Sequence, residues 1–166
     1  MGFQILPMVL CLLYVICLTL FIQMISKTRV PELVSAPCKI LIIDDDIDDV
    51  EILSDAFKDS GVESVHYVYT ALEAFMYLEK ITEKQDLPRL IVTNMHTPGI
   101  KGLEFLSDLK CMKVYKDIHV IVLTSFKREY EIEMARQLGA IDYVVKPNTY
   151  NDYQKVAADI GIKAGL

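Results

Sequence analysis

Hydrophobic residues follow two alternating patterns from about residue 38 onward. The first is a run of consecutive apolar residues that stops at polar ones, as in CKILIID at residues 38–44. Such a run is typical of a buried parallel strand. The second places Val50, Leu53 and Phe57 at helical spacing before a glycine, over residues 48–61. This spacing is typical of an amphipathic helix, so the chain begins its folded part with a strand followed by a helix.

The same two patterns recur to the end of the chain and give five strand–helix pairs. Further strands are predicted at residues 64–70, 89–94, 119–125 and 141–146, and further helices at 71–81, 103–112, 127–139 and from about Tyr150 onward. Three strands are apolar throughout, whereas the strand at 64–70 is more mixed and fits a sheet edge. We therefore expect an α/β fold of flavodoxin-like type, a doubly wound five-stranded parallel sheet with helices on both faces.

The first 26 residues form an apolar segment that precedes this fold. None of the 17 basic or 23 acidic residues lies within it, and about 23 helical residues would cross the ~30 Å hydrocarbon layer of a membrane. Basic residues follow the apolar run, as Lys27 and Arg29. This order favours a transmembrane helix over a cleaved secretory signal and places the domain in the cytoplasm.

The sequence thus divides into a single N-terminal apolar helix at 1–26, a tether at 27–37 and one folded domain at 38–166. We expect the helix to anchor the domain in the inner membrane. The alternative is a start at Met24 or another downstream codon, which would remove the anchor.

Charge and cysteine content exclude several classes of function. The net charge is −6 and the chain has no basic stripe, so direct binding to nucleic acid is not expected. The four cysteines are Cys11, Cys17, Cys38 and Cys111. Their spacing indicates neither a disulfide framework nor a zinc site.

Polar residues gather where the predicted strands end, which is where doubly wound sheets bind ligands. These residues are Asp44, Asp45, Asp46, Thr70, Asn94, Thr124, Ser125, Lys146 and Pro147. Singly, each has a structural explanation as a helix cap, a strand end or a solvated charge. Together, adjacent carboxylates suit a hard cation such as Mg²⁺, and a hydroxyl with an ammonium group suits phosphoryl oxygens. The set therefore predicts a pocket that handles phosphoryl groups.

On these residues the sequence resembles the receiver domain of two-component response regulators, over residues 38–166. The matching segments are KILIIDDD, IVTNMHTPGIKG, VIVLTS and DYVVKP. Asn94 and Thr124 are 30 positions apart, and Thr124 and Lys146 are 22 apart. This order and spacing make the resemblance specific.

The resemblance implies a Mg²⁺ site and a phosphoacceptor at the end of the third strand. The metal ligands would be Asp44, Asp45 and the backbone carbonyl of His96, with Asp46 as a third acid of unassigned role. The acceptor is an Asp in the family and is Asn94 here. The following turn also departs from the family, since it reads Thr97-Pro98-Gly99.

The resemblance also implies a switch. Thr124 and Lys146 would contact the phosphoryl group, and Lys146 would precede Pro147 through a cis peptide bond. Tyr143 would be the switch aromatic on the fifth strand. The output surface would comprise the helix at 127–139, the strand at 141–147 and the helix from Tyr150, and would meet a histidine kinase, a downstream effector or a second copy in a homodimer.

Asn94 changes the expected chemistry, because a receiver works by carboxylate attack on a phosphohistidine. An amide nitrogen is a poor nucleophile and the amide oxygen carries no formal charge. We therefore predict a pseudo-receiver: a non-enzymatic signalling module with no catalytic residues, weakened Mg²⁺ binding and action through protein contacts. Asn94→Asp should restore metal binding.

Four alternatives remain at this point. Asn94 could be a tolerated lesion in a decaying gene. Thr93 or Thr97 could accept the phosphoryl group instead, which the mechanism disfavours. The domain could be an ordinary phosphoryl-accepting receiver that tolerates Asn94. Least favoured is a phosphatase-type enzyme that uses Asp44 as its nucleophile.

Overall fold

The computed structural model describes residues 38–166. The predicted transmembrane helix at 1–26 and the tether at 27–37 lie outside the described residues. From residue 38 to 166, no helix has both the length and the apolar character needed to cross a bilayer.

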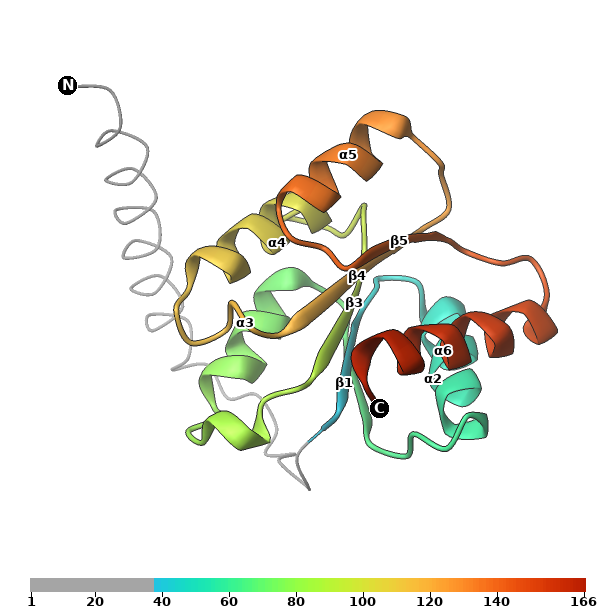
Figure 1. Ribbon diagram of the computed structural model, residues 1–166, viewed down its shortest axis with the longest axis horizontal. Helices are drawn as coiled ribbons and strands as arrows, with labels where there is room; N and C mark the ends of the chain where they lie inside the picture. The colour runs from blue at the N-terminus through green and yellow to red at the C-terminus, as the bar shows by residue number, and fades with distance from the viewer. Residues whose placement is uncertain (1–37) are drawn as a thin grey trace.

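A five-stranded parallel sheet forms the centre of the domain (Figure 1). Its strands are β1 (Ile40–Ile43), β2 (Val65–Val68), β3 (Leu90–Asn94), β4 (His119–Thr124) and β5 (Asp142–Val145), in the order β2-β1-β3-β4-β5. The helices are α2 (Ile47–Asp59), α3 (Ala71–Glu79), α4 (Gly102–Cys111), α5 (Glu129–Gln137) and α6 (Tyr150–Ala164), with a short 3-10 helix at Lys84–Asp86. The predicted doubly wound parallel sheet is confirmed, including an edge position for the strand near residues 64–70.

The helices cover both faces of the sheet. Figure 1 shows α2 and α6 side by side on one face and α3, α4 and α5 on the other. Alternate residues of β1 serve the two layers: Ile40 and Ile42 pack with the first group of helices, and Leu41 and Ile43 with the second. This two-sided burial explains why the strand is apolar at every position.

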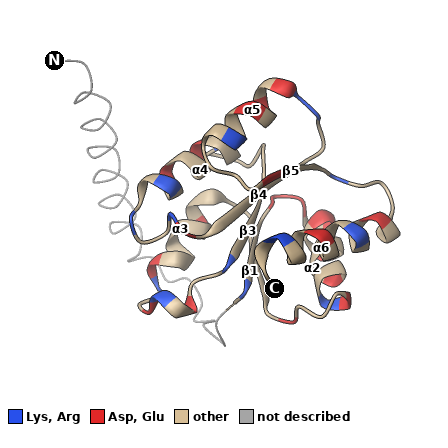
Figure 2. Cartoon of the chain, viewed as in Figure 1, with Lys and Arg blue, Asp and Glu red and all other residues tan. Residues whose placement is uncertain are grey.

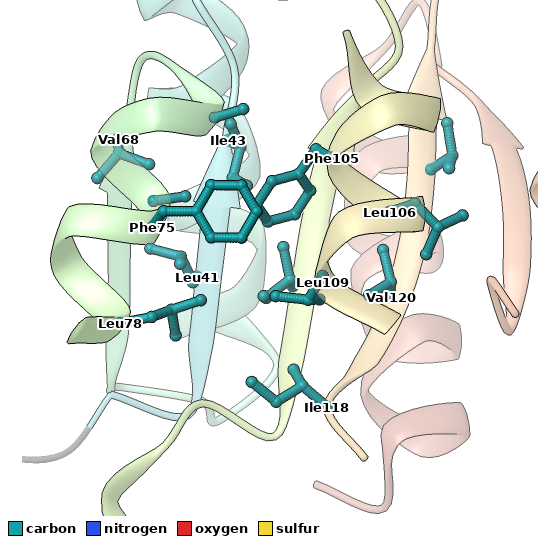
Figure 3. Close-up of a cluster of buried hydrophobic side chains, with 14 of the residues drawn as sticks. Leu41, Ile43, Val68, Phe75, Leu78, Phe105, Leu106, Leu109, Ile118 and Val120 are labelled. Atoms are coloured by element: carbon teal, nitrogen blue, oxygen red, sulfur yellow. The ribbon is translucent and has the colours of Figure 1, made fainter. Parts of the chain in front are cut away.

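The larger core lies between the sheet and helices α3 and α4 (Figure 3). Phe75 of α3 and Phe105 of α4 meet there in a tilted arrangement, with ring centroids 4.9 Å apart. Both side chains are fully buried. Aromatic pairs of this geometry add about 0.5–1.5 kcal/mol beyond the area they bury, so this pair helps to fix α3 and α4 against the strands.

The second core lies between the sheet and helices α2 and α6. Leu53 and Phe57 of α2 face Ala157 and Ile160 of α6, and all four side chains are buried. The small Ala157 allows the two helices to approach closely. This packing matters for the site because α2 begins directly after the acidic residues at the end of β1.

Asp46 ends the loop after β1 by capping α2. Its carboxylate accepts hydrogen bonds from the backbone N–H groups of Asp48 at 3.0 Å and Asp49 at 3.4 Å. A carboxylate at this position satisfies free N–H groups and favours the helix dipole. The third acid of the sequence motif therefore has a structural role as a helix cap.

Candidate functional site

The carboxyl ends of β1, β3, β4 and β5 meet at one edge of the sheet. Ile43 pairs with Thr93, Asn94 with Leu123, and Thr124 with Val145. Because the strands are parallel and in this register, the residues that end them or follow them lie together. The structure thus brings together the predicted site residues of these four strands.

Asn94 acts as a hydrogen-bond donor to the acidic residues after β1. Its Nδ2 lies 3.0 Å from Asp44 Oδ1 and 3.5 Å from Asp45 Oδ1. Its Oδ1 lies 3.5 Å from the backbone nitrogen of His96. An ionised carboxylate at position 94 would have no proton to donate and would repel Asp44. The amide therefore suits this pocket in the absence of a cation.

Lys146 supplies the positive charge of the pocket. Its Nζ lies 2.6 Å from Asp44 Oδ2 and 2.7 Å from Asp49 Oδ2, and its side chain is only 7% exposed. Burial opposes the charge on Lys146, but the hydrogen bonds to the two carboxylates outweigh it and raise the pKa of Lys146 above its ordinary value. Lys146 is therefore a firmly protonated counter-ion between two acids.

Asp44 is the central acceptor of the pocket and is almost fully buried. Burial raises the pKa of its carboxyl group, and the contact with Lys146 offsets only part of that rise. Oδ1 accepts from Asn94 and, at 3.2 Å, from the backbone N–H of Asp46, while Oδ2 accepts from Lys146. Both oxygens are thus engaged by groups of the protein.

Protein donors engage one of the two carboxylates predicted to bind Mg²⁺. Among residues 38–166 no third His, Cys, Asp or Glu side chain joins Asp44 and Asp45 to complete a metal site. Mg²⁺ needs oxygen ligands in near-octahedral geometry, whereas Lys146 and Asn94 already occupy the oxygens of Asp44. A divalent cation at Asp44 and Asp45 would have to compete with Lys146.

Of the predicted switch residues, Thr124 ends β4 and Tyr143 is the second residue of β5. Thr124 is fully buried, and its Oγ1 lies 3.5 Å from the backbone nitrogen of Phe126. The hydroxyl of Tyr143 lies 2.9 Å from the carbonyl oxygen of Phe126 and 3.1 Å from Glu131 Oε2. Burial, together with the Glu131 contact, raises the pKa of Tyr143 to about 12. The contacts of its hydroxyl with Phe126 and Glu131 thus hold the Tyr143 side chain in place.

Glu131 is a buried member of this switch region that the sequence alone did not reveal. Its Oε1 lies 3.1 Å from Arg128 Nη1 and 4.0 Å from His96 Nε2. Since its Oε2 is the atom near Tyr143, the carboxylate links α5 to β5. Its place in the charged helix segment KREYEIEMARQLG resembles that of a solvated surface acid, so its burial could not be predicted from the sequence.

The substitute acceptors Thr93 and Thr97 are both buried. Thr93 Oγ1 donates to the carbonyl oxygen of Asn94 at 3.2 Å, and Thr97 Oγ1 donates to that of Ile100 at 2.9 Å. Neither hydroxyl is presented to the pocket for phosphoryl transfer, so these contacts disfavour that alternative.

Two positions between the end of β3 and the first residue of α4 require glycine. Gly99 has φ +78°, the left-handed region that the Thr97-Pro98-Gly99 turn reaches. Gly102 packs so closely that an added Cβ would lie 2.6 Å from the carbonyl oxygen of Asn94. Gly102 therefore helps to set the backbone position of Asn94.

One prediction about this edge of the sheet is wrong. The described residues contain no cis peptide bond, so Lys146 and Pro147 are joined by a trans bond.

Asp49 and Tyr153 are two further site residues that sequence reasoning missed. Asp49 is the second acceptor of Lys146, and the Tyr153 hydroxyl donates to Asp49 Oδ1 at 2.8 Å. In the sequence, Asp49 looks like a first-turn helix acid and Tyr153 like an apolar core position. The two are 104 positions apart, so only the packing of α2 on α6 shows the contact.

Comparison with known families assigns most of the described residues to one family. The profile of the response regulator receiver domain matches residues 40–158. The chain belongs to this family. The match includes the four strand ends that form the pocket, and it stops within α6.

Among curated relatives, this receiver is similar to sporulation initiation phosphotransferase F of Bacillus subtilis (strain 168), with 28% identity over 109 residues. That match covers 66% of this chain and 82% of the relative. A chemotaxis protein CheY homolog of Campylobacter jejuni subsp. jejuni serotype O:2 is 26% identical over 111 residues, covering 67% and 82%. These proteins share the receiver domain with this chain.

Solved structures show the same fold. The phosphorylated cyanobacterial phytochrome response regulator RcpA matches with a TM-score of 0.67 and 26% identity, covering 76% of this chain and 92% of that one. The Mn²⁺-bound form of response regulator Rcp1 matches with a TM-score of 0.62 and 25% identity, covering 74% and 90%. The receiver is thus a signalling domain of two-component type.

Proposed function

We propose that this receiver is a pseudo-receiver, a module that signals through protein contacts and accepts no phosphoryl group at Asn94. The observation that carries the proposal is the hydrogen bond from Asn94 Nδ2 to Asp44 Oδ1. The side chain at the acceptor position points a donor at the acidic residues, where phosphoryl transfer needs an anionic nucleophile.

The electrostatics of the pocket support this proposal. Figure 2 shows acidic residues concentrated on α2 and on the loop before it. Lys146 neutralises part of this charge from within, at Asp44 and Asp49. Asn94 leaves the pocket with one carboxylate fewer than an aspartate would. The pocket is therefore stable without a bound cation, and we expect Mg²⁺ to bind only weakly.

The partner surface we propose is formed by α5, β5 and α6. Several large apolar side chains are exposed on or next to these elements, at 73% for Tyr130, 55% for Phe126 and 41% for Val145. Exposed aromatic residues of this kind are common at protein interfaces. A histidine kinase, a downstream effector or a second copy of the chain would meet the protein here.

The apolar segment at residues 1–26 supports one further proposal, from sequence alone. It would hold the receiver at the cytoplasmic side of the inner membrane, close to a membrane-bound partner.

An ordinary phosphoryl-accepting receiver is the competing function, because the relative from B. subtilis is named a phosphotransferase and the RcpA structure is described as phosphorylated. The test treats the full-length protein and its Asn94→Asp variant with acetyl phosphate and Mg²⁺, and measures intact mass. We expect no added phosphoryl group on the natural protein and a base-labile one on the variant. A base-labile adduct on the natural protein would contradict the proposal, and turnover of a general phosphatase substrate would favour the enzyme alternative.

A further inference from the structure

A continuous chain of hydrogen bonds runs from the pocket to α6. It starts at Asn94, passes to Asp44 at 3.0 Å and to Lys146 at 2.6 Å, continues to Asp49 at 2.7 Å and ends at Tyr153 at 2.8 Å. These hydrogen bonds connect Lys146, in the loop after β5, to α2 and then to α6. The two helices lie side by side in Figure 1. The route is separate from the one through Thr124 and Tyr143.

Asp49 is held from both sides, which distinguishes it from the other acids at the start of α2. Its Oδ2 accepts from Lys146 and its Oδ1 accepts from Tyr153. Its side chain is 25% exposed. Asp48, one residue earlier in the same helical turn, is exposed. A carboxylate with both oxygens engaged has a fixed orientation, and charge-assisted hydrogen bonds of about 2.5–2.9 Å are the strong ones.

Tyr153 is the α6 end of this chain and belongs to the core. The residue is 4% exposed and packs among the buried side chains between α2 and α6. Burial, with the hydrogen bond to Asp49, raises the pKa of Tyr153 above its ordinary value. A buried tyrosine hydroxyl needs a partner, so a change in the position of Asp49 disturbs Tyr153 and the first turns of α6.

We propose that Asp49 is a positioning residue for Lys146 and that the Asp49–Tyr153 hydrogen bond couples the position of Lys146 to α6. Asp49 retains the ammonium group when Asp44 is engaged by another cation or by a partner. The movement of Lys146 between the two carboxylates then reaches α6, one element of the proposed partner surface. Nothing in the receiver resemblance assigns a role to either residue.

The signalling meaning of this coupling rests on the proposed function, but the contacts can be tested with neither phosphoryl donor nor metal. Failure of this test and phosphorylation of the natural protein are therefore separate results. The sample is the isotope-labelled full-length protein in detergent micelles. The measurement is nuclear magnetic resonance of the Lys146 ammonium group and of the α6 backbone amides.

In the natural protein we expect a through-hydrogen-bond correlation between Lys146 Nζ and Asp49 Cγ. In Asp49→Asn we expect the ammonium protons to exchange with water about tenfold faster, since a neutral amide oxygen accepts more weakly than a carboxylate. The α6 amides near Tyr153 should also exchange faster. Asp48→Asn is the matched control, because it removes the same charge one residue away, and it should leave both rates within about twofold.

Tyr153→Phe separates coupling from simple packing. It removes only the hydroxyl and should accelerate exchange of both the α6 amides and the Lys146 ammonium protons. If exchange becomes faster at the α6 amides but not at the Lys146 ammonium group, Tyr153 has only a structural role and the coupling is overturned. If Asp49→Asn matches Asp48→Asn, the positioning role is overturned. Should a variant fail to fold, absence of the Lys146–Asp49 correlation in the natural protein overturns the proposal by itself.

Discussion

The side-chain amide of Asn94 donates a hydrogen bond to the carboxylate of Asp44 across 3.0 Å. This contact places a donor where a receiver that is phosphorylated needs a nucleophile. It also removes the repulsion that two neighbouring carboxylates would cause. Under the proposed function, this one residue would account both for the absence of phosphoryl transfer and for weak Mg²⁺ binding.

Asn94→Asp should make the stability of the protein depend on Mg²⁺. The new carboxylate would face Asp44 and Asp45 without a donor, which we expect to cost about 1–3 kcal/mol in the free energy of unfolding. Saturating Mg²⁺ should recover most of this loss. Urea unfolding followed by circular dichroism, with Mg²⁺ or with a chelator, measures both effects. Equal stabilisation of the natural protein by Mg²⁺ would show that Lys146 and Asn94 do not replace the metal.

Lys146→Met should destabilise the protein strongly, because it leaves Asp44 and Asp49 close together without their counter-ion. Removing one member of a buried ion pair costs about 3–5 kcal/mol. Lys155→Met is the control, since Lys155 pairs with Asp152 at the surface and such pairs contribute about 0–1 kcal/mol. Similar unfolding midpoints in urea for both variants would mean that Lys146 is not the charge that stabilises the pocket.

Gly102→Ala and Gly161→Ala form a pair with opposite expected effects. The new Cβ at Gly102 would lie 2.6 Å from the carbonyl oxygen of Asn94, whereas at Gly161 it would meet nothing within 4 Å. We expect Gly102→Ala to cost about 1–3 kcal/mol through steric strain. Gly161→Ala lies within α6 and should stabilise the protein by about 0.5–1 kcal/mol through reduced backbone entropy.

Thermal unfolding of the two glycine variants distinguishes these effects. The amide signal of Asn94 should move in Gly102→Ala and stay in place in Gly161→Ala. An unchanged unfolding temperature for Gly102→Ala would show that the backbone between β3 and α4 can shift without disturbing the site.

Asp108 should make stability fall as the pH rises. Its Oδ2 is buried and has no hydrogen-bond partner within residues 38–166. Burial, with the nearby charge of Glu104, raises the pKa of Asp108 from 3.8 to about 6. Between pH 3.8 and about pH 6 the folded protein keeps a proton on Asp108 that the unfolded chain releases. The free energy of unfolding therefore decreases as the pH increases. The loss of unfolding free energy reaches its full value above the raised pKa of about 6. It amounts to at most about 3 kcal/mol.

Asp108→Asn isolates this contribution, because the amide does not titrate. The difference in unfolding free energy between the variant and the natural protein should change between pH 4 and pH 7 in favour of the variant. Glu129→Gln, which removes an exposed carboxylate on α5, is the matched control. A flat difference for Asp108→Asn would place its pKa near the ordinary value.

The arrangement of the strands could be predicted from sequence because it depends on local patterns. Continuous apolar runs such as residues 38–44 required burial on both faces, and parallel pairing then brought Asp44, Asn94, Thr124 and Lys146 to one edge. The actual partners of these groups could not be predicted. The sequence indicated that Lys146 would face a phosphoryl group, whereas the structure pairs it with two carboxylates.

Long-range side-chain contacts account for most of what the sequence did not show. Asp49 belongs to an acidic run in which each residue resembles a helix cap, and its contact with Tyr153 depends on the packing of two distant helices. Glu131 is buried and contacts Tyr143 and Arg128, which no periodicity along α5 indicates. The cis bond before Pro147 was carried over from the family resemblance and is absent here.

The most direct test of the central claim is binding of beryllium fluoride in the presence of Mg²⁺, followed by fluorine nuclear magnetic resonance of the full-length protein. This analogue binds a carboxylate oxygen at the acceptor position beside Mg²⁺ and requires no phosphoryl donor. We predict no bound fluorine signal for the natural protein and a stoichiometric one for Asn94→Asp. A stoichiometric bound signal for the natural protein that disappears in Asn94→Ala would contradict the account.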